Sequence, residues 1–204
     1  MKTRDRILLC ALELFNEQGE PNVTTLDMAN ELDISPGNLY YHFKGKEALL
    51  EVLIDDFLLS TRSLLSPADD PDEVSPEDLW LLLHLLFEAI ATYRFLFQDL
   101  SNLMSRYPFI RHAMQAWLHQ LRQCLAHILL MMRAAEHLHC NDEGMQRLLD
   151  AVCQTCLFWL DYQRIVAVEQ PDPAAGVQQV LGLLLPYLDE ETEEWMQALI
   201  DRYS

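Results

Sequence analysis

Glycine and proline are scarce in this chain, which has 6 and 9 of them among 204 residues. Collagen-like and low-complexity chains need far more of both, so those classes are excluded. Apolar residues make up 50% of the chain, which is too many for an intrinsically disordered protein. Leu, Ala, Glu and Gln are abundant, and no segment alternates apolar and polar residues as a strand does. We therefore expect an all-α fold.

Long apolar runs are also missing. The most apolar stretch, residues 79–91, is interrupted by His84 and Glu88 and is too short to span a bilayer. The polar start, Met1 to Arg6, is not followed by the apolar run of a signal peptide. The five cysteines are an odd number without a secreted context, so we expect free thiols. The sequence predicts a cytoplasmic protein with no membrane partner.

Positive charge is in short supply, with 14 basic residues against 32 acidic ones and a net charge of −18. Because attraction to phosphate dominates affinity for nucleic acid, this balance argues against DNA binding at first sight. The charge is uneven, however: residues 1–50 carry a net of −3 and the rest carry −15. A DNA-binding site would therefore depend on local geometry near the N-terminus.

Motifs of enzymes are absent as well. The chain has no Gly-rich phosphate loop, no GxSxG, no HExxH and no paired carboxylates in an apolar helix. We expect no enzyme activity, no cofactor and no metal.

Capping residues near the N-terminus predict two short helices joined by a tight turn. A first helix over residues 4–18 ends at Gly19. Thr24 and Asp27 form a capping box that opens a second helix to about Leu32. Ser35 caps a third helix with Pro36 in its first turn. This arrangement is typical of a helix-turn-helix.

The third helix has one apolar side and one polar side. Leu39 and Phe43 are four residues apart and face a small core. Gly37, Asn38, Tyr41 and His42 fall on other faces and are suited to bases and phosphates. Lys46 lies at the start of the next helix, where the helix dipole disfavours a cation. A lysine at this position therefore suggests that an anion such as a phosphate binds there. From spacing alone, the alternative remains that these helices form a small subdomain that does not bind DNA.

The segments 24–29, 32–43 and 46–50 together resemble the N-terminal domain of TetR-family repressors, over roughly the first 55 residues. One departure is Asp33, where the family usually has a glycine in the left-handed conformation, which Asp tolerates better than most residues. The resemblance implies an N-terminal three-helix DNA-binding domain that contacts operator DNA through Thr24, Thr25, Ser35, Pro36, Gly37, Asn38, Tyr40, Tyr41, His42 and Lys46.

The remainder predicts further helices, at about residues 46–65, from Ser75-Pro76 onwards, and at about 93–106, 108–137, 142–168, 173–188 and 190–202, with a polar linker over 66–72. We expect a DNA-binding domain over 1–48 and a larger helical domain over 49–204 that binds an effector and forms a homodimer. The resemblance implies a dimer built from the last long helices. Two apolar stripes agree with it, and burial inside the monomer is the alternative: Leu148, Leu149, Val152, Cys156 and Leu160, then Val177, Val180, Leu181, Leu184 and Leu188.

Large apolar side chains with a few polar groups among them predict a ligand cavity in the second domain. The expected lining residues are Trp80, His84, Phe87, Phe97, Met104, Trp117, Leu121, Trp159 and Tyr162. The predicted function is a repressor that a small, mostly hydrophobic effector releases from a palindromic operator.

Three alternatives remain open. Cys153 and Cys156 form a CxxC, which permits a redox sensor. The cluster His137, His139, Cys140, Asp142 and Glu143, with Cys124 and His127 nearby in sequence, permits a metal sensor. A helical adaptor that binds other proteins is the third.

Overall fold

The computed structural model describes residues 2–66, 75–166 and 172–202. Within these ranges all regular elements are helices, and the one β-type pairing is an isolated bridge between Leu138 and Leu188. The all-α prediction is confirmed. No helix among the described residues has the length and apolar content needed to cross a membrane. Of the expected linker, 66–72, residues 67–72 lie outside the described ranges.

Contacts group the chain into two compact units. The first comprises residues 1–60 and 93–114, and the second comprises residues 61–92 and 115–204. These units reflect packing, whereas the division of function between residues 1–48 and 49–204 stays a prediction.

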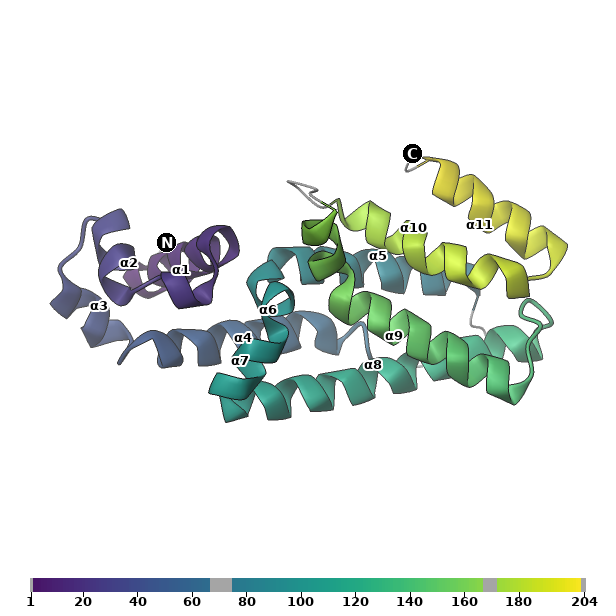
Figure 1. Cartoon of the computed structure of the whole chain (residues 1–204), viewed down its shortest axis with the longest axis horizontal. Coiled ribbons are helices and arrows are strands. Elements are labelled where there is room, and N and C mark those ends of the chain that lie inside the picture. Colours follow the sequence, from purple (N-terminus) through teal and green to yellow (C-terminus); the bar gives the residue numbers. More distant parts are fainter. Residues whose placement is uncertain (1, 67–74, 167–171, 203–204) are drawn as a thin grey trace. The chain divides into compact units, whose positions relative to one another are not determined.

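The first unit holds the N-terminal helices (Figure 1). They are α1 (Thr3–Gln18), the 3-10 turn η1 (Glu20–Asn22), α2 (Thr25–Glu31), α3 (Pro36–His42) and most of α4 (Lys46–Arg62), joined by α6 (Arg94–Gln98) and α7 (Leu100–Arg106). Aromatic rings pack these helices against α6. The ring centres of Phe15 (α1) and Phe95 (α6) are 5.4 Å apart, and so are those of Phe57 (α4) and Phe97 (α6). The helix α6 therefore contributes to the core of this unit.

A single helix was predicted for about residues 93–106, and this was wrong. The structure breaks it at Asp99, whose backbone (φ −138°, ψ 27°) is not helical. The Asp99 carboxylate accepts a hydrogen bond from the Asn102 side chain at 2.8 Å. Asp favours such local bonds over a helix interior, but one Asp is too weak a signal to predict a break.

The second unit is built around α5 (Pro76–Thr92), α9 (Asp142–Ile165) and α10 (Pro173–Leu184), with α11 (Glu190–Arg202) beside α10. The long helix α8 (Pro108–Ala134) begins in the first unit and continues in the second. The predicted helix over 173–188 ends earlier than expected, because the turn Leu185–Tyr187 is a 3-10 helix, η2.

Both predicted subunit stripes are buried inside the single chain. Leu181 is 0% exposed and Leu184 is 1% exposed, and the other eight members are buried too. These residues form the core between α5, α9 and α10. Their assignment to the subunit interface was therefore wrong.

Close packing of α10 on α5 depends on Gly176. A Cβ at this position would lie 2.3 Å from two ring carbons of Phe87, and that ring packs edge-on against Trp159 at 5.3 Å. We expect Gly176→Ala to destabilise the protein by about 1–3 kcal/mol, because the core is overpacked. Gly182→Ala on the same helix is the control: its Cβ meets nothing within 4 Å, so it should be neutral or stabilising. Equal unfolding midpoints in urea for the two variants would refute this packing.

Candidate functional site

Side-chain caps fix the first turns of both α2 and α3. Thr24 Oγ1 accepts from the Asp27 amide at 3.2 Å, and the Asp27 carboxylate accepts from the Thr24 amide at 2.8 Å. Ser35 Oγ accepts from the Asn38 amide at 3.2 Å. These bonds confirm both predicted caps. The Thr24 hydroxyl also lowers the pKa of Asp27, so its carboxylate stays ionised.

Asp33 takes the left-handed conformation that the turn requires, with φ 52°. The Ile34 amide then returns to the Ala29 carbonyl at 3.0 Å, which closes the end of α2. The expectation for Asp33 is confirmed: Asp adopts this region at some cost, and the turn survives without glycine.

The apolar side of this segment is buried and its polar side is open. Leu39 and Phe43 are buried as predicted, together with Met28 and Ala29 of α2. On the other side, Tyr40 is 58% exposed and Tyr41 is 78% exposed. Two aromatic side chains held in water on a helix of seven residues are unusual unless they meet a partner.

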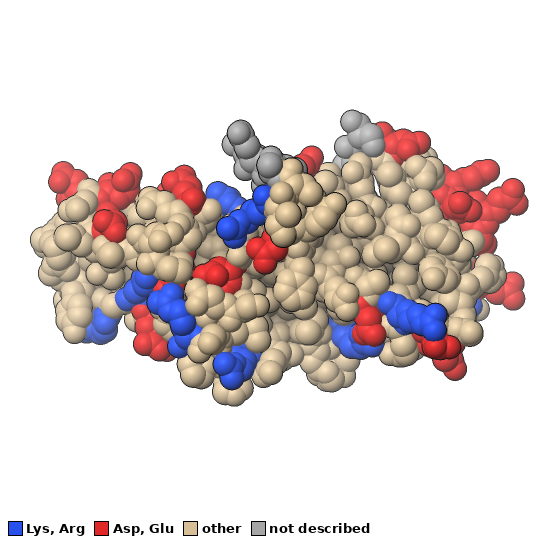
Figure 2. Space-filling model, in the orientation of Figure 1, with Lys and Arg blue, Asp and Glu red and all other residues tan. Residues whose placement is uncertain are grey.

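The structure brings nine of the ten predicted DNA-contact residues to the start of α2 and to α3. Thr25 and His42 are half-buried, and the other seven are exposed: Thr24, Ser35, Pro36, Gly37, Asn38, Tyr40 and Tyr41. Figure 2 shows the electrostatic setting: around α1–α4, most Lys and Arg side chains lie along the lower edge of the view and most Asp and Glu side chains along the upper edge. The acidic excess is therefore kept apart from part of this surface.

Lys46, the tenth predicted contact, directs its side chain toward the protein's own Glu20 and Val23. Its ammonium lies 2.9 Å from Glu20 Oε1 and donates to the carbonyls of Glu20 and Val23 at 2.9 and 3.0 Å. The anion expected at the start of α4 is thus a carboxylate of the chain itself. Sequence reasoning missed Glu20, because one acidic residue in a loop carries no motif.

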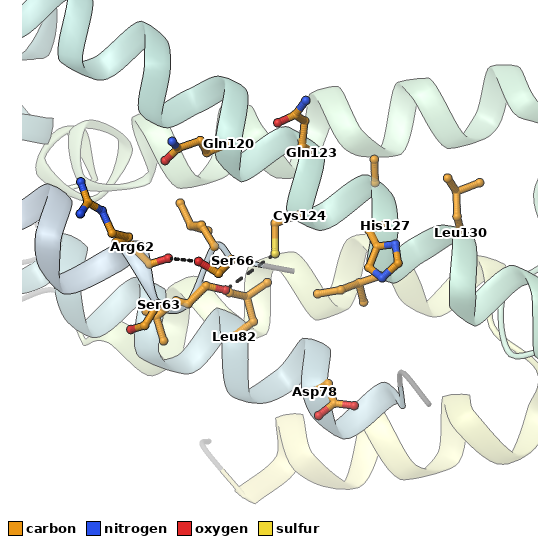
Figure 3. A pocket seen from close by; sticks show the side chains of 14 residues that line it. Arg62, Ser63, Ser66, Asp78, Leu82, Gln120, Gln123, Cys124, His127 and Leu130 are labelled. Carbon is orange, nitrogen blue, oxygen red and sulfur yellow. Dashed lines mark hydrogen bonds between the residues drawn. The ribbon is translucent and has the colours of Figure 1, made fainter. Parts of the chain in front are cut away.

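The larger cavity lies in the second unit and has a volume of about 910 Å³. Its wall combines six apolar residues with eight polar, charged or thiol-bearing ones. The apolar residues are Leu64, Leu65, Leu82, Ala126, Ile128 and Leu130, and the others are Arg62, Ser63, Ser66, Asp78, Gln120, Gln123, Cys124 and His127. Figure 3 shows His127 projecting from α8 into the space between α8 and α5. Its Nε2 is buried and has no hydrogen-bond partner among the described residues.

The thiol of Cys124 faces the same cavity. Its sulfur lies 3.8 Å from the Leu64 carbonyl, and burial raises the pKa of this thiol (Figure 3). The cavity therefore offers a neutral thiol and an imidazole within a wall of mixed polar and apolar residues.

None of the nine predicted ligand-lining residues lines this cavity. Phe87, Phe97, Trp117 and Leu121 are buried in the cores of the two units. Trp80 and His84 stack on each other at 5.6 Å, and Met104 is half-buried on α7. Trp159 and Tyr162 line a separate groove of about 510 Å³, whose other members are Ala151, Gln154, Thr155, Phe158, Gln179 and Leu183.

The structure buries the CxxC, and it does not gather the histidine cluster into a metal-binding group among the described residues. Cys153 and Cys156 are both buried, and burial raises the pKa of both thiols, which makes them poor redox sensors. His137 pairs with Asp189 at 3.1 Å. Among the described residues, no group of three or more His, Cys, Asp or Glu side chains lies close enough to hold a metal ion.

Comparison with known proteins agrees with this architecture. Residues 7–53 match the family described as "Bacterial regulatory proteins, tetR family", and residues 59–195 match that described as "Bacterial transcriptional repressor" under the name TetR. The class C tetracycline repressor of Escherichia coli is 38% identical over 69 residues, which cover 34% of this chain and 32% of that protein. The repressor KstR2 of Mycolicibacterium smegmatis is 40% identical over 55 residues, or 27% of each chain. The matches thus span about a third or less of these curated relatives.

Solved structures match over the whole chain. A TetR-family regulator from Marinobacter aquaeolei VT8 has a TM-score of 0.88 and 32% identity, with 100% of this chain and 99% of that chain covered. The ketosteroid regulator KstR2 of Mycobacterium tuberculosis, with a TM-score of 0.65, 23% identity and coverage of 93% and 96%, shares the fold. The chain belongs to the TetR family of bacterial transcriptional regulators.

Proposed function

We propose that this TetR-family regulator is a homodimeric repressor that binds a palindromic operator through α3 and releases it when a small, mostly hydrophobic effector binds. The observation that carries the DNA-binding part is the two-sided α3. Its apolar residues are buried, whereas Asn38, Tyr40 and Tyr41 are exposed on a short helix with capped ends. Asn can pair bidentately with adenine, and tyrosine can reach phosphates or base edges.

The test of this proposal is a comparison of two DNA duplexes of equal length in fluorescence anisotropy. One comes from the region upstream of the protein's own coding sequence, and the other has the same base composition in scrambled order. We expect the upstream duplex to bind at least about 10³-fold more tightly at physiological salt. Equal affinity for the two would leave only phosphate attraction and would refute an operator-binding regulator.

The cavity lined by His127 is the proposed effector site. Its volume of about 910 Å³ suits a drug-sized molecule. Apolar residues such as Leu82 and Ile128 can contact the hydrophobic part of such a molecule, and the polar side chains of the wall can fix its orientation. A ligand that bonds to His127 Nε2 would also satisfy a buried polar atom, which otherwise costs free energy.

Two continuous helices offer a path from this cavity to the DNA-binding segment. α4 begins at Lys46, directly after that segment, and ends at Arg62, which lines the cavity. α8 contributes residues 120–130 to the cavity and begins at Pro108, next to Tyr107, which contacts Glu20. An effector acts on DNA affinity only by favouring one conformer, a coupling that is typically about 1–3 kcal/mol.

Filling the cavity should separate effector response from DNA binding. Ala126 lines the cavity, so we expect Ala126→Phe to occupy effector space while operator affinity stays within about threefold of wild type. The control is Ala116→Phe, at an exposed position on the same helix. Compounds that raise the melting temperature of the wild type should still stabilise Ala116→Phe but not Ala126→Phe. Equal stabilisation of both variants would move the effector site elsewhere.

The groove between α9 and α10 is the proposed subunit interface. Phe158 and Tyr162 of α9 are 47% and 60% exposed, and both line this groove with Gln179 and Leu183 of α10. Exposed aromatic side chains beside two adjacent helices suit a self-complementary interface, in which two helices from each subunit form a four-helix bundle.

A further inference from the structure

The Lys46 ammonium has no donor left for a phosphate. An ammonium has three N–H groups, and the three acceptors described above lie between 2.9 and 3.0 Å from it. All three belong to η1 and the residue after it. Its side chain is also only 22% exposed. A phosphate contact would therefore require Lys46 to break bonds inside the protein.

The buried carboxylate of Glu20 holds the Lys46 side chain in this position. The Glu20 side chain is 0% exposed, and three groups surround its carboxylate. Oε1 accepts from Lys46 at 2.9 Å and from the Tyr107 hydroxyl at 2.9 Å, and Oε2 accepts from Arg106 at 2.6 Å. Breaking a buried ion pair by removing one partner strongly destabilises a protein, because a charge is left without compensation. We refer to Glu20, Lys46, Arg106 and Tyr107 as the Glu20 cluster.

Lys44, two residues earlier, is placed quite differently. It is exposed in the short turn between α3 and α4, and no ion pair joins it to a carboxylate among the described residues. Its ammonium lies 4.6 Å from the centre of the Tyr40 ring, on the exposed side of α3. A cation held over an aromatic face keeps its donors available, and here it adjoins the surface proposed to meet DNA.

We propose that Lys44 is the phosphate-binding lysine of this turn, and that Lys46 is a positioning residue that acts through Glu20. This inference rests on the proposed DNA binding. The Glu20 cluster joins η1 before α2, the start of α4 and the end of α7, all within the first unit. Lys46 thus fixes the frame of the helix-turn-helix, while Lys44 supplies charge to the DNA backbone.

The two lysines are distinguished by the salt dependence of operator binding. Each phosphate contact contributes about one unit to the slope of log K against log salt concentration. We expect Lys44→Gln to reduce the slope of the dimer by about two, one per subunit. The matched variant Lys46→Gln should keep the wild-type slope and lose affinity by the same factor at every salt concentration. Adding Glu20→Gln to Lys46→Gln should recover most of that loss, because the buried charge is removed as well.

Two results would overturn this inference. One is a wild-type slope for Lys44→Gln, which is an exposed variant and will fold. The other is a slope reduced by Lys46→Gln that Glu20→Gln does not restore. If wild-type protein showed no preference for the upstream duplex, the proposed function would fail too, and that outcome is distinct from either slope result.

Discussion

Phe158→Glu is expected to convert the protein from a dimer into a monomer and to lower operator affinity at least about 100-fold. The substitution places a charge in the proposed subunit interface, where an unpaired charge is costly. Two linked DNA-binding domains gain about 10²–10⁴ in avidity over one, and a monomer loses that gain. Mass by light scattering and affinity by anisotropy measure the two effects.

The control for this variant is Leu81→Glu. Leu81 of α5 has the same exposure as Phe158, 47%, but does not line the α9–α10 groove. It should remain a dimer with wild-type operator affinity. A dimeric Phe158→Glu protein would place the subunit interface elsewhere on the molecule.

Tyr41→Ala is expected to weaken operator binding about 30-fold or more without loss of stability. Each lost contact to DNA costs about 1–3 kcal/mol, and a symmetric dimer loses two. The side chain is mostly exposed, and its ring packs edge-on against that of His42 with 5.2 Å between the ring centres, so the core is unaffected. Affinity comes from anisotropy titration and stability from urea unfolding.

Leu59→Ala is a suitable control, since Leu59 is an exposed apolar residue of α4 outside the proposed DNA surface. It should bind like the wild type. Tyr41→Phe separates the contribution of the hydroxyl from that of the ring. Wild-type affinity for Tyr41→Ala would exclude this face of α3 from the DNA interface.

The helix-turn-helix could be predicted in detail because its signals are local. Thr24, Asp27, Ser35 and Pro36 act within three or four residues of themselves, so the caps follow directly from the order of residues. Asp33 departs from the family pattern, but its side chain is one that tolerates a positive φ, and the turn is retained.

The cavity could not be predicted, because its lining depends on tertiary packing. Large aromatic residues at helical spacing, such as Phe87 and Trp117, occur both around ligand pockets and in solid cores, so the pattern does not distinguish the two. In this fold they fill the core, whereas the cavity is lined by smaller residues such as Ala126 and Cys124. His127 was named only beside the possible metal cluster, and its place in the cavity wall was not predicted.

The subunit stripes failed for a related reason. α9 and α10 are apolar on more than one side, so periodicity alone does not say which side faces the rest of the chain. Val177, Val180 and Leu181 have the more regular spacing, and the chain buries that side against its own α5 and α9. The side left exposed carries Phe158 and Tyr162, which are four residues apart, and this second stripe of α9 was overlooked.

The role of Lys46 was also beyond the reach of sequence, since its partner Glu20 is 26 residues away. A lysine at the start of a helix indicates an anion nearby, and this inference was sound. Only the fold identifies the anion as a buried carboxylate that belongs to the protein.

Hydroxyl-radical footprinting of the wild-type protein on its own upstream DNA tests the central claim most directly. A dimer that places one α3 in each of two successive major grooves should protect two half-sites related by a palindrome, with centres about 34 Å or one helical turn apart, or a multiple of that spacing. The same protection should vanish with Tyr41→Ala at equal protein concentration. Uniform protection along the duplex, or a footprint that Tyr41→Ala leaves unchanged, would contradict operator recognition through α3.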